Sequence, residues 1–191
     1  MNILNGGEKM IAYKGFAPGL ICRGYQFVPG LNKTEKANCR ENGFHCAENP
    51  LDCLTYYPNM DQAEYYIVNA GGDIDEDGND TKISCTELTV LKKLTKEDFF
   101  LHGLAFMADH PLREWSCRVV KDKAEAAAGY AVVRGIDPVA RGKKGDILAF
   151  AKENPVDGHI IQIALAQVDG IKLLSDIWYG ADLTESEVAL L

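Results

Sequence analysis

The stretch that decides the fold is GFHCAENPLDCLTYY, residues 43–57. Residues 44–47 read as a short strand, and Asn49 followed by proline predicts a helix start. Asn is a strong N-cap, and proline lacks the N–H that would stay unpaired at the first helical position. Asp52 follows the cap by three residues, where its carboxylate can accept from the cap's own N–H, and Pro58 should end the helix. A strand that runs straight into a helix exposes backbone N–H groups at one rim, where binding sites are often built.

The composition is that of an ordinary globular protein, with 47% apolar and 25% charged residues in 191. A net charge of −8 and a pI near 5.0 argue against nucleic acid or an anionic membrane as partner, because both require concentrated Lys and Arg. The sequence has no apolar run of membrane-spanning length, and its first ten residues lack a signal-peptide core. We therefore expect a cytoplasmic protein, with Met10 as a plausible start.

Six cysteines without an export signal predict reduced thiols rather than disulfides. A zinc site at Cys39, Cys46 and His45 is the alternative, but the chain has no CxxC knuckle, so we expect no metal and no cofactor. The acidic segment 71–80 contains D-x-D-x-D-G, the opening of a calcium-binding EF-hand loop. Ser84 stands where that loop needs a bidentate Glu, which favours a solvated hairpin turn.

Strand and turn patterns predict several elements in the first half of the chain. Residues 31–42 read as a loop. A change in apolar parity predicts a bulge near Thr86-Glu87 in the second strand of a hairpin. The expected strands are 10–16, 20–28 with a bulge or close backbone approach at Gly24, and a hairpin of 63–70 with 83–90.

The second half begins with a helix over 96–109, capped by Thr95 and ended by Pro111. The small residues of 123–145 suit close backbone packing, such as rungs of a β-solenoid. Residues 146–151 and 159–168 predict a hairpin whose second strand is central, because it is apolar on both faces. A last strand at 171–174 and a short terminal helix capped by Thr184 complete the prediction.

Clustered strands without regular βαβ alternation predict an α+β fold with a mixed or antiparallel sheet and short helices. We expect a main domain over residues 1–120, built around the 43–57 junction. A β-rich segment over 121–191, with its hairpin and terminal helix, is expected to pack on it.

Three motifs resemble an uncharacterised family of phage and prophage proteins: KGF at 14–16, CRGYQ at 22–26, and the stretch 43–57. The small-residue segment 123–145 is also similar to Ala/Gly-rich repeats in members of that family. The resemblance covers most of the chain and implies a phage accessory protein in the host cytoplasm. It brings no known reaction.

A second resemblance is to the ADP-ribosyltransferase fold, in which a first strand carries Arg or His before Gly and a later strand leads into a helix with a Tyr. Lys14 and Gly15 match the first motif here, and His45 with Tyr56 the second. This resemblance implies a nicotinamide-type pocket between Lys14 and His45. The sequence departs from the family pattern, because Lys replaces Arg or His, His45 replaces a Tyr, and Glu87 is the only candidate for the catalytic acid.

The candidate binding residues are cationic and aromatic, which suits an anion that carries a ring, such as a nucleotide. Our main hypothesis is non-catalytic binding of such a small molecule or of a host protein. An NAD-using ADP-ribosyltransferase with Glu87 as its acid, and a structural or assembly module, are the alternatives. The expected ligand-binding residues are Tyr13, Lys14, Arg23, His45 and Tyr56.

Overall fold

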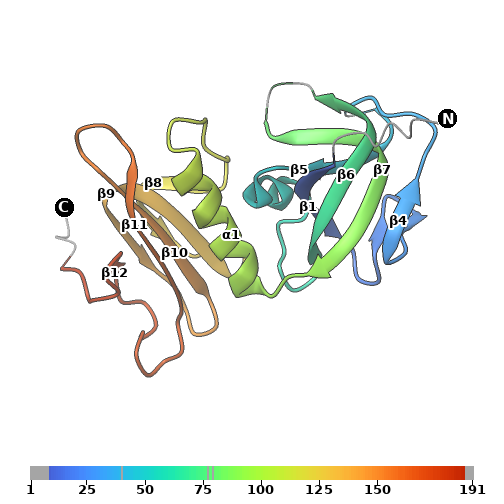
Figure 1. Cartoon of the computed structure of the whole chain (residues 1–191). Coiled ribbons are helices and arrows are strands. Elements are labelled where there is room, and N and C mark those ends of the chain that lie inside the picture. Colours follow the sequence, from blue (N-terminus) through green and yellow to red (C-terminus); the bar gives the residue numbers. More distant parts are fainter. Residues whose placement is uncertain (1–8, 40, 77, 79, 188–191) are drawn as a thin grey trace. The chain divides into compact units, whose positions relative to one another are not determined.

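The computed structural model describes residues 9–39, 41–76, 78 and 80–187. The chain forms two compact units, residues 1–95 and 96–191, each described by itself below (Figure 1). It is mostly β, with 48% strand and 11% helix, so the expected α+β class holds only in part. No helix among the described residues is long and apolar enough to cross a membrane.

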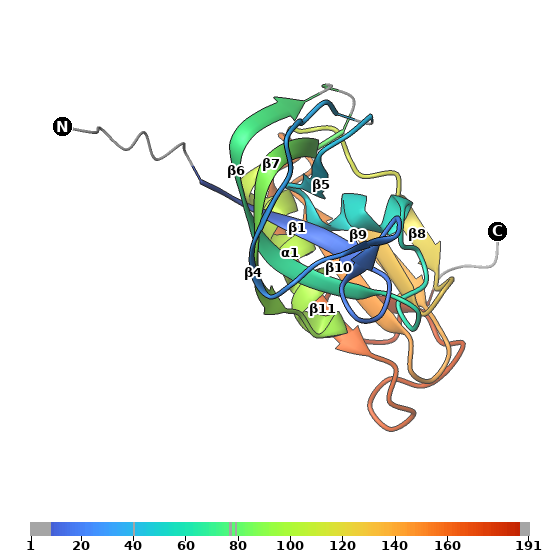
Figure 2. The ribbon, with the colours of Figure 1, turned by 90° about the vertical axis from the view of Figure 1, so that its right-hand side faces the viewer.

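Antiparallel strands make up the first unit. β6 pairs with β1 on one side and with β7 on the other, and β5 pairs with β7 and, where Ala47 faces Tyr13, with β1. These four strands therefore close on themselves, and β4 continues along β7 beyond β5; Figure 2 shows β1, β5, β6 and β7 around this ring. The strands are β1 Met10–Phe16, β2 Ile21–Cys22, β3 Tyr25–Gln26, β4 Gly30–Lys33, β5 Phe44–Ala47, β6 Glu64–Glu76 and β7 Lys82–Lys93.

The core of this unit lies inside the ring of strands. Along β1, Ala12 and Phe16 are both fully buried in it, as expected for residues two or four apart on a strand. Phe16 packs edge-on against Phe27, with ring centroids 5.1 Å apart. Lys14 shares the face of Ala12 and Phe16, so this strand carries a charged side chain toward an apolar interior.

The 43–57 junction forms where it was predicted, but as a short 3₁₀ helix, η1, over Pro50–Thr55. Asn49 caps it, since its side-chain oxygen accepts from the N–H of Leu51 at 3.0 Å. The predicted reciprocal bond from Asp52 is wrong. Thr81 Oγ1 accepts from the Asn49 N–H instead, and the Asp52 carboxylate accepts from the Thr81 hydroxyl at 2.7 Å. Tertiary contact with Thr81 thus replaces a local cap.

The β6–β7 hairpin is longer than predicted, and its pairing shifts between Gly71 and Ile74, opposite Thr86 and Glu87. The predicted bulge is confirmed in place, but the additional residues belong to β6. Thr86 Oγ1 accepts from the Asp73 N–H at 2.8 Å, and Gly72 has a φ of +72°. Residues 77 and 79 of the proposed calcium loop lie outside the described residues.

Two other predictions for this unit are wrong. The single strand over 20–28 is a two-stranded hairpin, β2–β3, whose turn residues Arg23 and Gly24 have φ values of 48° and 81°. Positive φ at both central residues is characteristic of the two-residue type I′ hairpin turn. The loop over 31–42 begins with β4, because Asn32 is buried and its side chain bonds the carbonyls of Val28, Gly30 and Leu88.

The described residues of the second unit form one helix and a sheet. The helix lies at the predicted residues, and the predicted hairpin forms as β10 and β11. β8, β9 and β10 pair in parallel, so that Val119, Val132 and Ala149 stand side by side. The elements are α1 Lys96–Asp109, β8 Val119–Glu125, β9 Tyr130–Arg141, β10 Ile147–Glu153, β11 Ile160–Gln167 and β12 Tyr179–Gly180.

Three predictions for the second unit fail. β11 lies at the edge of the sheet instead of its centre. Residues 171–174 are not a strand, since Asp169 Oδ1 accepts from the N–H groups of Ile171, Lys172 and Leu173 and holds them in a turn. Residues 184–187 are not helical, and the rest of the predicted terminal helix, 188–191, lies outside the described residues.

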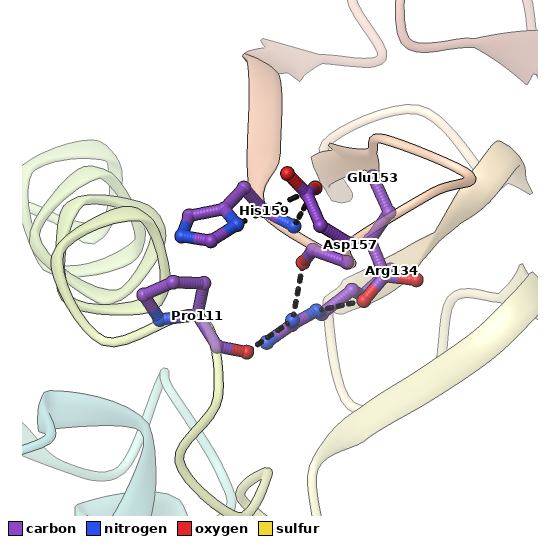
Figure 3. Close-up of polar contacts among 6 residues, drawn as sticks. Pro111, Arg134, Glu153, Asp157 and His159 are labelled. Carbon is purple, nitrogen blue, oxygen red and sulfur yellow. Dashed lines mark hydrogen bonds and ion pairs between the residues drawn. The ribbon is translucent and has the colours of Figure 1, made fainter.

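A buried arginine holds two loops of this unit together (Figure 3). Arg134 on β9 is 2% exposed, and its Nε donates to Glu153 at 2.6 Å. Its Nη2 donates to the carbonyl oxygens of Pro111 and Gly158 at 2.7 and 3.3 Å, and its guanidinium lies 4.6 Å from the ring centre of Trp115. The Arg134 guanidinium finds its hydrogen-bond partners within the unit, so we interpret the cluster as structural.

Candidate functional site

A cavity of about 290 Å³ opens in the first unit, where β1, the β2–β3 turn, β5, η1 and the start of β7 meet. Its lining combines cationic, aromatic and thiol side chains. The lining residues are Lys14, Gly15, Cys22, Arg23, His45, Cys46, Ala47, Asp52, Cys53, Tyr56, Tyr57 and Lys82.

Lys14 is the most deeply buried cation of the cavity, at 4% exposure. Its Nζ donates to the His45 carbonyl oxygen at 2.6 Å and lies 3.6 Å from the Cys22 sulfur. The same ammonium lies 5.2 Å from the ring centres of both Phe16 and Phe27. Within the described part of the chain, none of these partners is a carboxylate.

Lys82 is the second buried cation, at 9% exposure. Its Nζ donates to the Tyr56 hydroxyl at 2.8 Å and lies 4.7 Å from the centre of that ring. Arg23 is the third cation of the lining, and it is exposed at the tip of the β2–β3 turn. Neither forms an ion pair with a described carboxylate. Asp52, the one acidic residue among the described residues of the lining, accepts from both the hydroxyl and the N–H of Thr81.

The pKa of His45 is affected by its burial and by the cations around it. Burial, followed by the charges of Lys14, Lys82 and Arg23, lowers the pKa of His45 to about 4. The imidazole is therefore neutral at pH 7 and can accept a hydrogen bond through one ring nitrogen. The cavity favours negative charge and disfavours a further proton.

Two of the three cavity thiols are held protonated. Burial raises the pKa of Cys53 to about 12. A hydrogen bond with Cys85, together with burial, raises the pKa of Cys46 well above its usual range. The third thiol, Cys22, accepts a hydrogen bond from the Tyr57 hydroxyl at 3.2 Å. Among the described residues, no group of three His, Cys, Asp or Glu side chains could hold a metal, so Cys39, Cys46 and His45 do not form such a group.

The structure brings four of the five predicted binding residues, Lys14, Arg23, His45 and Tyr56, to this one cavity. Tyr13 is not among its lining residues. Tyr13 and Lys14 are neighbours on β1, and neighbours on a strand point to opposite faces.

Glu87, the predicted catalytic acid, does not line the cavity. It lies on β7 opposite Gly71 and Lys33. Its carboxylate forms an ion pair with Lys33 Nζ at 2.6 Å.

Sequence reasoning did not single out Lys82, Asp52 or Tyr57 as site residues, although all three line the cavity. Lys82 enters because β7 pairs with β5 in a register that sets it opposite Ala47. That register depends on long-range pairing, which local pattern does not specify. Asp52 and Tyr57 belong to the 43–57 stretch that supplies His45 and Tyr56. Their closeness in sequence to these two residues could have indicated them.

Residues 10–102 match a family described as Domain of unknown function (DUF7666). The matched range contains every residue that lines the cavity. Neither the curated proteins nor the solved structures include a match to the chain. The cavity thus belongs to the part of the chain that resembles this uncharacterised domain.

Proposed function

We propose that the cavity of the first unit binds a small anion that carries a ring, such as a nucleotide, without turnover. The observation that carries the proposal is the gathering of Lys14, Arg23 and Lys82 with no carboxylate partner among the described residues. The resemblance of its N-terminal motifs to phage and prophage proteins supports a role as a phage accessory protein.

The charge argument rests on burial. An ionised group taken out of water costs several kcal/mol unless an opposite charge offsets it. Lys14 and Lys82 are 4% and 9% exposed, and their hydrogen-bond partners are a carbonyl, a thiol and a phenol. In a chain with a net charge of −8, such a cationic site is locally exceptional. An anionic ligand supplies the missing counter-charge.

The ring argument rests on Tyr56 and Tyr57, which line the same cavity. Tyr56 is 45% exposed, so a ligand ring can reach its side chain, over which Lys82 Nζ already lies. The volume of about 290 Å³ lies just below the usual range for ligand sites, roughly 300–1,000 Å³. This size supports a mononucleotide better than a dinucleotide such as NAD.

The lining also favours binding over catalysis. Cleavage of an N-glycosidic bond needs a carboxylate to stabilise the positive charge that develops on the ribose. Glu87 is paired with Lys33 outside the lining, and Asp52 is already engaged by Thr81. The ADP-ribosyltransferase alternative therefore lacks a placed acid.

Calorimetric titration with AMP, adenosine, inorganic phosphate and NAD tests the proposal. AMP should bind more tightly than adenosine, and added salt should weaken it. Lys82→Gln should weaken AMP binding about tenfold or more, since a hydrogen bond to a charged group contributes about 1.5–3 kcal/mol. Lys33→Gln, an exposed lysine of the same unit, is the matched control. Circular dichroism verifies that both variants fold.

Equal binding of AMP and adenosine, or no binding of any probe, contradicts the proposal. Release of nicotinamide from NAD that disappears in Glu87→Ala would instead establish the enzymatic alternative.

A further inference from the structure

The cavity of the first unit carries more positive than negative charge. Among the described residues of its lining, Lys14, Arg23 and Lys82 are cationic and Asp52 is the one carboxylate. Three cations and one carboxylate leave a formal charge of +2 at pH 7, with histidine, cysteine and tyrosine neutral. A ligand that neutralises the cavity therefore carries two negative charges.

The other titratable groups of the lining support this charge. Burial and the three cations lower the pKa of His45 to about 4, so its imidazole is neutral at pH 7. Burial raises the pKa of the Cys53 thiol to about 12. Burial, followed by the hydrogen bond with Cys22, raises the pKa of Tyr57. These groups do not offset the excess of positive charge.

Two strands bring the two lysines to the same end of β5. β5 pairs with β1 on one side and with β7 on the other, where Ala47 faces Tyr13 and Lys82. Lys14 follows Tyr13 on β1, and its ammonium donates to the carbonyl oxygen of His45 in β5 at 2.6 Å. Both ammonium groups therefore face one cavity, and an anion between them offsets the repulsion of their like charges.

The two ammonium groups also offer as many donors as a terminal phosphate accepts. An ammonium carries three N–H groups. Lys14 directs two of them at the His45 carbonyl oxygen and the Cys22 sulfur. Lys82 directs one at the Tyr56 hydroxyl. One N–H of Lys14 and two of Lys82 then have no partner among the described residues, and a phosphate monoester presents three strong acceptor oxygens.

We infer that the cavity selects the dianion of a phosphate monoester, as in a nucleotide with a terminal phosphate, over a singly charged ester of similar size. This inference rests on the proposed binding of an anion that carries a ring. A phosphate monoester approaches a charge of −2 above its second pKa of about 6, whereas a phosphate diester or a sulfate ester carries a single charge. A dianion costs more to remove from water than a monoanion, and the charge of this lining offsets that cost. Cyclic nucleotides, whose phosphate is a diester, should therefore bind weakly.

Calorimetric titration at about pH 8 with AMP, its phosphate monomethyl ester and adenosine 5′-sulfate tests the inference, because AMP is then a dianion and the other two are monoanions. The three ligands share one nucleoside. AMP should bind about tenfold or more tightly than either monoanion.

Variants of the lining test whether its charge causes this preference. Lys82→Gln and Lys14→Met each remove one cation, so the preference for AMP over adenosine 5′-sulfate should fall about threefold or more in each. Lys33→Gln is the matched control, since Lys33 pairs with Glu87 outside the lining, and it should keep the wild-type preference. Circular dichroism verifies that the variants fold.

Equal affinity for AMP and adenosine 5′-sulfate overturns this inference and leaves the proposed binding of a ring-bearing anion in place. A preference for AMP that both lysine variants keep at its wild-type size also overturns it, because the charge of the lining would then not be the cause. Failure of all three ligands to bind overturns the inference together with the proposed function.

Discussion

His45 lies among the cavity cations and should sense an anion that enters. In the folded protein, burial and the charges of Lys14, Lys82 and Arg23 lower the pKa of His45 to about 4. A bound phosphate offsets these cations, so we expect AMP to raise the His45 pKa, as followed by the ring resonances in NMR titrations. A His45 pKa that stays near 4 when AMP saturates the protein would place the ligand elsewhere.

The same shift predicts how stability depends on pH. Because the folded pKa of about 4 lies below the ordinary 6.5 of histidine, unfolding takes up a proton between these two values. The free energy of unfolding should therefore fall as the pH falls from about 6.5 to 4. His45→Gln should lose less stability over this window than the wild type, as measured by urea unfolding at both ends. Carboxylates elsewhere affect both proteins alike, so they do not change the difference between them. Equal losses of stability would show that His45 does not cause the pH dependence.

Arg23 occupies a backbone conformation that favours other residues. Its φ of 48° lies in the left-handed region, which costs an ordinary residue about 1–2 kcal/mol and suits Asn or Gly. Arg23→Asn should thus raise the free energy of unfolding by up to about 1 kcal/mol and weaken AMP binding. Denaturant unfolding and calorimetry measure the two effects. A variant that loses stability, or that binds AMP as tightly as the wild type, refutes this role.

At the scale of residues, four of the five side chains expected to line a pocket do line the cavity, and Tyr13 does not. Lys14, Arg23, His45 and Tyr56 were chosen because their motifs stand out locally, and they line one cavity. Tyr13 was grouped with Lys14 although neighbours on a strand face opposite ways. Their role in binding stays a prediction.

At the scale of elements, predictions succeeded where the local signals agreed. β1 and α1 begin and end at the predicted residues, because turn residues or caps bound each pattern on both sides. β11 was expected at the centre of its sheet because its residues are apolar on both faces, but it lies at the edge. An apolar sequence does not show which other elements cover a strand. The cap of η1 also differs from the prediction, because Asp52 bonds Thr81, which is distant in sequence, instead of the Asn49 N–H.

Arg134 and Arg141 give a matched comparison on one strand. Both lie on β9 and pair with a glutamate, but the Arg134 side chain is 3% exposed and that of Arg141 34%. Arg134→Met leaves Glu153 and two carbonyls without their donor and should cost about 3–5 kcal/mol. Arg141→Met removes an exposed pair and a contact with Trp178 and should cost about 1 kcal/mol. Equal losses in urea unfolding would contradict a structural role for the Arg134 cluster.

At the scale of the whole molecule, the chain contains separate apolar cores. One core lies within the ring of strands of the first unit and includes Phe16, Phe44 and Leu88. Another lies in the second unit, around Leu148, Phe150 and Tyr179. Each unit thus buries its own apolar side chains, which is the usual requirement for independent folding.

The residues that line the cavity all lie between Lys14 and Lys82, inside the unit of residues 1–95. A fragment of residues 1–95 should therefore fold alone and bind AMP with the affinity of the full chain, because the strand ring closes without any residue beyond 95. Dispersed amide resonances in NMR and calorimetry on the fragment measure the two properties. Lys82→Gln in the fragment is the control and should weaken AMP binding as it does in the full chain. A folded fragment that fails to bind, beside a full chain that binds, would show that the site needs residues of the second unit.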